Sequence, residues 1–84
     1  MGHQIIPPAA ELECVEVAVY ACDTYCTNCL FAEMQTWRND ANLPLYTQMC
    51  IPSSEYPYRA TAYEIVAPSP CEEPISGNTS EWGF

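Results

Sequence analysis

Two stretches of the chain alternate between apolar and polar positions with the period of two that is typical of a half-buried β-strand. In the first stretch, residues 13–21, Val15, Val17 and Val19 point one way and the residues between them point the other. The second stretch, residues 58–66, alternates in the same manner. The pattern therefore predicts two strands that are separated by a non-alternating middle part.

The segment 25–38 predicts a helix instead, because it contains neither proline nor glycine. Asp23 and Thr24 precede it and are residue types that cap a helix N-terminus. Arg38 stands in the last turn, where its charge suits the helix dipole. At about 100° per residue, one broad apolar face collects Cys26, Cys29, Leu30, Met34 and Trp37. We therefore expect the main helix here.

The segment 45–51 fits two structures. Pro44 at a first helical position favours a short helix, whereas the residues at 45–47 and 50–51 could also pair as a strand. We favour a short helix or a single turn of one. The expected fold class is then α+β, with a small antiparallel sheet packed against one main helix, and optionally a second short helix, in a disulfide-stapled α/β sandwich.

The chain is expected to be one domain. Residues 1–10 end in two prolines and two alanines and predict an extended lead-in, whose first three residues we expect to include additions for expression. Residues 11–75 are expected to form the disulfide-rich domain, and residues 76–84, which show no periodicity, a flexible tail. No signal peptide and no run of about 18 apolar residues is visible, so we expect a mature domain without a membrane span.

Six cysteines in 84 residues are the expected source of extra stability. A chain this short buries only about 60–65% of its unfolded surface, and an even number of cysteines in a small domain is typical of extracellular disulfide frameworks. Because three cysteines cluster and three are dispersed, we expect each clustered cysteine to pair with a distant one, and Cys26 and Cys29 not to bond to each other. Fifteen pairings are possible, so the connectivity stays open. The expected disulfide residues are Cys14, Cys22, Cys26, Cys29, Cys50 and Cys71.

The clustered cysteines also raise two metal-binding alternatives. Their C-x3-C-x2-C spacing is the one that radical SAM enzymes use for an iron–sulfur cluster, but the chain is too short for the barrel of those enzymes. Cys26 and Cys29 have the spacing of a zinc ligand pair, yet no second pair follows and the single histidine is His3. We therefore expect neither a metal nor a cofactor.

The formal net charge is −9, from two arginines and eleven carboxylates. A phosphate backbone or an anionic membrane would repel such a chain, so nucleic acid is not an expected partner. Catalytic groups are also scarce, because His3 lies in the lead-in and the glycines do not form a phosphate loop. The acidic groups near the first strand and after Cys71 (Glu11, Glu13, Glu16, Glu72 and Glu73) are expected to be solvated. We expect no enzyme activity.

Aromatic side chains supply the candidate interaction surface, because six tyrosines and two tryptophans can act as anchors at a protein interface. Tyr56, Tyr58 and Arg59 surround a proline-rigidified loop and form the preferred contact surface, and Trp82 is the next candidate. Asn78 begins an Asn-Thr-Ser glycosylation acceptor pattern.

The valine-rich strand, the cysteine-bearing segment CDTYCTNCLFAEMQTWR, the proline loop and the second alternating strand resemble small secreted cysteine-rich effectors of plant-pathogenic fungi. Over residues 12–71, the architecture and cysteine placement look most like those that share the α/β sandwich of the virally encoded killer toxins of smut fungi. The resemblance implies action outside the producing cell, on a host plant or competing microbes, without a known enzymatic site. The chain departs from a full split βαβ duplication, because no second long helix and strand fit after Val66.

Two functions follow as expectations. The first is a secreted effector or toxin-like protein that binds an unidentified protein target of a host or competitor. The alternative is an inhibitor of a secreted protease or other hydrolase, with the loop 54–59 in the enzyme's cleft and Arg59 as the primary-site residue. Whether two copies form a homodimer through a sheet edge stays open.

Overall fold

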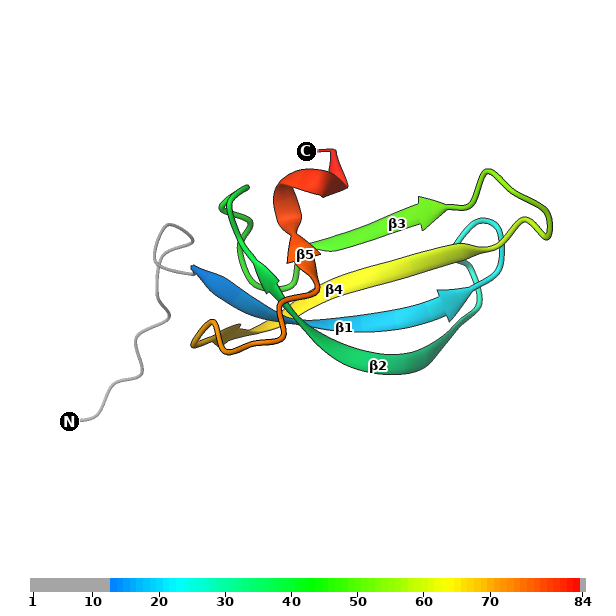
Figure 1. The fold of residues 1–84 in the computed structure, drawn as a ribbon. Helices are drawn as coiled ribbons and strands as arrows, with labels where there is room; N and C mark the ends of the chain where they lie inside the picture. The colour runs from blue at the N-terminus through cyan, green and yellow to red at the C-terminus, as the bar shows by residue number, and fades with distance from the viewer. Residues whose placement is uncertain (1–12, 84) are drawn as a thin grey trace.

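The protein folds around one twisted sheet of five strands, as the computed structural model shows for residues 13–83 (Figure 1). The spatial order is β3-β4-β1-β2-β5. All neighbouring strands pair antiparallel except β2 and β5, which pair parallel. The strands are β1 (Cys14–Cys22), β2 (Cys29–Arg38), β3 (Gln48–Pro52), β4 (Ala60–Ser69) and β5 (Gly77–Asn78). The expected lead-in, residues 1–10, lies outside the described residues.

The two alternating stretches are strands, as predicted, and they form β1 and β4 at the centre of the sheet. β1 pairs with β2 on one side and with β4 on the other. Both edges of β1 are paired and its three valines are buried, so β1 forms the centre of the sheet and of its apolar packing. The alternation in the sequence was sufficient to identify this strand.

The expected main helix over 25–38 is wrong, and with it the helix-packed α+β sandwich. The segment is a loop followed by β2, and the one helical element within residues 13–83 is the 3-10 helix η2 (Thr79–Trp82). The β1–β2 register shifts between Val19 and Tyr20, which leaves an extra residue at Ala32. Across this bulge Phe31 and Met34 lie on the same side of the sheet although they are three residues apart. That spacing imitates a helical period.

The segment 45–51 also becomes a strand rather than the short helix that we favoured. A single turn precedes β3, in which the backbone N–H of Thr47 donates to the Pro44 carbonyl at 3.3 Å and the Thr47 hydroxyl donates to the same oxygen at 2.7 Å. From Gln48 the chain extends and pairs with β4. The strand alternative was therefore the correct one.

The core lies on one face of the sheet, towards which the apolar side chains of β1 point. Its buried members are Val15, Val17, Val19, Trp37, Leu43, Ile65 and Trp82. Trp82 comes from η2, and its ring centroid lies 5.4 Å from Trp37 and 5.3 Å from Tyr63. Residues 76–84, expected to be a flexible tail, therefore contain β5 and η2 within their described part, and this part closes one end of the core (Figure 1).

Buried polar groups hold η2 against the segment that follows β2. The hydroxyl of Thr79 donates to Oδ1 of Asn39 at 2.9 Å, and Nδ2 of Asn39 donates to the Leu43 carbonyl at 2.9 Å. Gly77 lies directly against the Trp37 ring, where an added Cβ would come within 2.7 Å of Cζ3. Glycine is therefore the residue that lets β5 approach the core this closely.

Candidate functional site

Three disulfides connect all six cysteines and fix both ends of the sheet. Cys14 at the start of β1 bonds to Cys71, whereas Cys22 bonds to Cys29 and Cys26 bonds to Cys50. The expectation that every clustered cysteine reaches a distant one is wrong, because Cys22 and Cys29 pair within the cluster. The expectation that Cys26 and Cys29 do not bond to each other is confirmed.

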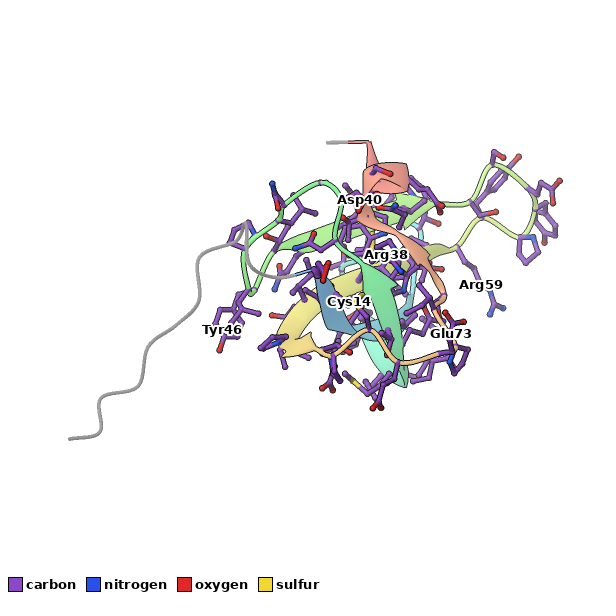
Figure 2. The ribbon with its side chains drawn as sticks, turned by 60° about the vertical axis from the view of Figure 1, so that its left-hand side comes forward. Cys14, Arg38, Asp40, Tyr46, Arg59 and Glu73 are labelled. Atoms are coloured by element: carbon purple, nitrogen blue, oxygen red, sulfur yellow. A yellow bond between two sulfur atoms is a disulfide. The ribbon has the colours of Figure 1, made fainter. Side chains whose placement is uncertain are left out.

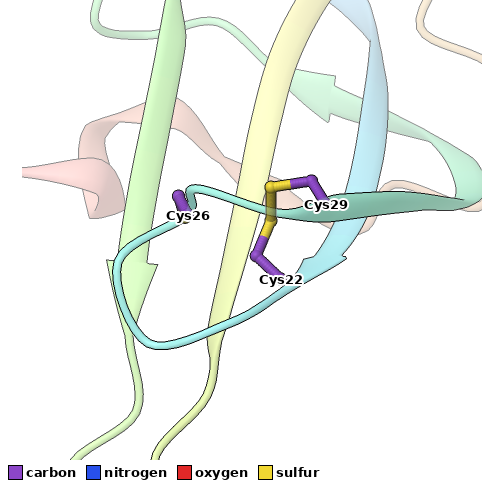
Figure 3. Close-up of side chains that lie close together, drawn as sticks. All are labelled: Cys22, Cys26 and Cys29. Carbon is purple, nitrogen blue, oxygen red and sulfur yellow. A yellow bond between two sulfur atoms is a disulfide. The ribbon is translucent and has the colours of Figure 1, made fainter.

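Two of these disulfides determine the path of the loop between β1 and β2. The Cys22–Cys29 bond closes the base of the loop, and Cys26 bonds to β3, which lies beyond β4 in the sheet. Figure 3 shows the loop crossing β4 to reach β3. The sulfurs of Cys22, Cys26 and Cys29 lie within 4.8 Å of one another. The Cys22–Cys29 bond accounts for one of these contacts, and the path of the loop towards Cys50 brings Cys26 beside that bond. Sulfurs in disulfides present no thiolate to a metal ion.

Asp23 organises the same loop through its carboxylate. Its oxygens accept from the backbone N–H of Thr27 at 2.8 Å and of Tyr25 at 3.3 Å, and from Asn28 through both its backbone and its side chain. The Thr27 hydrogen bond is the main reason that the pKa of Asp23 is lowered from its usual value. Asp23 thus caps backbone N–H groups as predicted from its residue type, but it caps a turn and not a helix.

The second loop of this end, residues 53–59, joins β3 to β4. The backbone N–H of Ser53 donates to the Arg59 carbonyl at 2.7 Å, which closes the loop at its base. The hydroxyl of Thr24 donates to the Tyr58 carbonyl at 2.7 Å, so the two loops are also tied to each other. The rings of Tyr56 and Tyr58 meet edge to face at 5.9 Å.

We define the tyrosine end as the exposed side chains that these two loops and the start of β2 present: Tyr25, Leu30, Tyr56, Tyr58 and Arg59. Tyr25 is 84% exposed, Tyr56 85% and Leu30 78%. An open hollow of 1010 Å³ lies here, with Thr24, Tyr58 and Arg59 among its walls. Figure 1 shows the 53–59 loop extending beyond the strands at this end. The arrangement therefore places aromatic rings on a protruding surface whose backbone is held in place.

The structure brings Tyr56, Tyr58 and Arg59 together on one exposed loop. The predicted strand over 58–66 therefore began two residues too early, because β4 begins at Ala60. Trp82 does not join them, because it is 5% exposed and packs in the core; its assignment to an interaction surface is wrong. Burying the Trp82 ring against Trp37 and Tyr63 is more favourable than leaving it in water.

Asn78 has a structural role that its glycosylation pattern does not indicate. Its Oδ1 caps η2 by accepting from the Ser80 backbone at 3.2 Å, and its Nδ2 donates to Asp40 at 2.7 Å. Nδ2 is the atom that an attached glycan would occupy. Glycosylation of Asn78 stays a prediction.

Sequence reasoning missed Tyr25 and Leu30 as surface residues, because it placed both on the expected helix. A usable signal was present in the loop's composition. Asp23 and Asn28 are turn-forming residue types that stand just inside Cys22 and Cys29, and such a pair is typical of a closed hairpin loop. That pattern would have identified the loop and its exposed aromatic residue.

Within residues 13–83, no helix has the length and apolar character that crossing a membrane requires. Comparisons with protein-family models, with curated proteins and with solved structures find no match.

Proposed function

We propose that this chain is a secreted effector or toxin-like protein that binds a protein target of a host plant or a competing microbe through the tyrosine end, without catalysis. The observation that carries the proposal is the exposure of three tyrosines on two loops that are tied together. Large aromatic side chains dominate the energy of protein interfaces when a partner covers them. Here they lie on the surface although the core contains other aromatic residues that are buried.

The fixed backbone of the tyrosine end supports the proposal. Binding through a loop normally costs conformational entropy, and a loop that is already ordered avoids part of that cost. The Cys26–Cys50 disulfide and the hydrogen bond from Thr24 to Tyr58 hold the two loops before any partner arrives. The side chains of Tyr56 and Tyr58 have few rotatable bonds, so they too lose little freedom on contact.

The disulfides also support extracellular action. Three disulfides in a small domain are typical of extracellular proteins. Such bonds persist in an oxidising compartment, whereas the cytosol keeps most thiols reduced. We therefore place the binding event outside the producing cell.

The test compares Tyr56→Ala/Tyr58→Ala with Tyr46→Ala, which removes another exposed tyrosine from a turn outside the tyrosine end. Parent and variants are infiltrated into leaves and added to cultures of competing fungi. We expect the parent to produce a response, Tyr46→Ala to match it, and the double variant to need at least about tenfold more protein, because two anchors are lost. No response to the parent in either assay, or equal potency of all three proteins, would contradict the proposal.

A second candidate is an inhibitor of a secreted protease, and one observation favours it. Arg59 is exposed beside the closed loop, and Figure 2 shows its side chain extending away from the ribbon. A cationic side chain on an ordered loop suits the primary pocket of a trypsin-like protease. The two arginines allow a matched test, in which Arg59→Ala should abolish inhibition of such proteases and Arg38→Ala should preserve it. Cleavage of the loop without inhibition would eliminate this candidate.

A further inference from the structure

Within residues 13–83, the outer edge of β2 has no strand partner over most of its length. β1 pairs with one side of β2 from Cys29 to Arg38, but on the other side β5 pairs only with Trp37 and Arg38. The adjoining hydrogen bond, from the Ser76 N–H to the Thr36 carbonyl at 2.7 Å, marks the end of this coverage. From Cys29 to Gln35 the edge has no strand partner among residues 13–83 (Figure 1).

The backbone groups of this edge are directed outwards in the pattern that an added strand needs. Thr36 accepts a hydrogen bond from Ser76, so its backbone groups point away from β1. Because backbone direction alternates along a strand, the N–H and C=O of Met34 also point outwards. The Thr36 carbonyl is already bonded to Ser76, and the bulge at Ala32 interrupts the regular strand. Regular pairing with an added strand therefore centres on Met34.

The edge is protected only in part. Proteins commonly shield open edges with lysine, proline, other charged side chains or a bulge. β2 contains neither lysine nor proline, its bulge at Ala32 shields the part before residue 33, and Glu33 is the one charged residue between the bulge and Thr36. Phe31 and Met34 are instead 59% and 45% exposed. The edge thus combines unpaired backbone groups with apolar side chains, which is the composition of a strand that accepts a partner.

Acidic residues beside the edge favour a positively charged partner. A hollow of 440 Å³ adjoins it, and Met34, Thr36 and three acidic residues are among those that line it: Glu16, Glu33 and Glu72. Nε2 of Gln35 donates to Oε2 of Glu33 at 2.7 Å. No arginine or lysine is among the residues that line this hollow. A second copy of the chain would bring the same carboxylates to the contact and add another net charge of −9, so self-pairing is disfavoured.

We propose that the open edge of β2 binds an extended segment rich in lysine or arginine from a partner protein, which adds to the sheet as a further strand. Main-chain hydrogen bonds to Met34 and its neighbours supply affinity, and basic side chains that reach the acidic hollow supply specificity. The pairing residues around Met34 lie outside the tyrosine end, which shares only Leu30 with β2, so the inference does not depend on the proposed function.

The first experiment uses a short, end-blocked peptide of alternating lysine and threonine, with a peptide of alternating glutamate and threonine as its control. Binding is followed by backbone amide chemical shifts of the isotope-labelled protein. We expect saturable shifts at residues 31–36 with the basic peptide and none with the acidic one. Glu72→Lys should weaken binding at least about tenfold, whereas Glu55→Lys, the same charge change in the 53–59 loop, should weaken it much less.

The second experiment separates strand addition from simple charge attraction. A peptide that is N-methylated at alternate residues keeps its charges but loses the N–H groups that would pair with β2, and we expect it not to bind. In the protein, Met34→Pro removes an outward N–H at an edge position that tolerates proline, and Met34→Thr retains that N–H. Met34→Pro should abolish binding and Met34→Thr should preserve it.

Three results would overturn the inference: equal binding of the methylated peptide, shifts that map away from β2, or an edge already occupied by a second copy in solution. If Met34→Pro fails to fold, binding of the methylated peptide to the parent protein still tests strand addition. Tyr56→Ala/Tyr58→Ala should bind the basic peptide like the parent. A failure here therefore leaves the proposed function of the tyrosine end untouched.

Discussion

The two ends of the sheet are stabilised by different means. At one end, rings from Trp37, Tyr63 and Trp82 pack within 5.4 Å of one another, and η2 closes over them. At the tyrosine end the aromatic rings are exposed, and the loops that carry them are held by Cys26–Cys50, Cys22–Cys29 and hydrogen bonds. Both ends carry disulfides, since Cys14–Cys71 lies at the packed end. The difference is that buried rings add to the covalent link at the packed end, whereas at the tyrosine end disulfides and hydrogen bonds order the loops without buried rings. Disulfides thus allow a chain this small to expose apolar side chains on a defined backbone.

The largest expected effect is at the packed end. Trp82→Ala should lower the free energy of unfolding by about 3–5 kcal/mol, the usual cost of truncating a buried tryptophan. Trp82→Phe should cost less, because it keeps most of the ring volume and removes an indole N–H that has no hydrogen-bond partner within the described residues. Urea unfolding measures both variants. A loss below about 1 kcal/mol for Trp82→Ala would show that η2 does not close the core.

The next effect tests how the tyrosine end is held. Cys26→Ser/Cys50→Ser opens a loop of sequence separation 24 and should cost about 3.5 kcal/mol in the chain-entropy model. The loss should be concentrated in the loop 23–28, whose amide protons should exchange faster, while the Trp82 environment stays intact. Hydrogen exchange followed residue by residue makes this measurement. Unchanged exchange in the loop would mean that hydrogen bonds alone hold it.

The strands show where sequence patterns were sufficient. β1 alternates without interruption and both of its neighbours lie in the same sheet, so local periodicity and final structure agree. β2 was misread because the bulge at Ala32 changes the spacing of its apolar residues and because Leu, Ala, Glu, Met and Gln are good helix formers. Pairing with β1 overrides that propensity, and a pairing between strands cannot be read from one segment alone.

The site was predicted in part for similar reasons. Proline and serine in the 53–59 loop are turn-forming residues, so the sequence placed Tyr56 on a loop correctly. Tyr58, which the alternation also placed at the start of a strand, lies before β4. Trp82 lies in a segment without periodicity, and only the long-range contact with Trp37 buries it. The pairing of Cys22 with Cys29 likewise depends on the hairpin register, which opposes these two residues across β1 and β2.

A smaller effect concerns the close approach of β5. Gly77→Ala places a Cβ against the Trp37 ring and should cost about 1–3 kcal/mol, the usual range for overpacking a core. Gly83→Ala is a useful contrast, because Gly83 has open space around it and the strain there would come from its φ of 88°. Thermal unfolding with near-ultraviolet circular dichroism would report the Trp37 environment. An unchanged tryptophan signal in Gly77→Ala would show that β5 can move away freely.

The smallest effect is at Asp23. Because hydrogen bonds in the folded loop lower its pKa, the stabilisation is present at neutral pH and is lost as pH falls below the unfolded value of 3.8 through the lower folded pKa. Amide exchange at Thr27 and Asn28 should therefore increase in acid relative to exchange in the core strands. Asp23→Asn should remove this pH dependence while Asp40→Asn should leave it. If amide exchange in the loop changed with pH in the same way in the parent and in Asp23→Asn, the disulfides alone would account for the order of the loop.

The central claim is that the exposed rings of the tyrosine end are dispensable for folding because covalent links and hydrogen bonds order their loops. The most direct measurement is the free energy of unfolding of Tyr56→Ala/Tyr58→Ala in urea, compared with the parent protein. We expect a difference within about 0.5 kcal/mol, as for other exposed side chains without buried contacts. A loss of about 2 kcal/mol or more would contradict it, because the rings would then stabilise the fold as those of the packed end do.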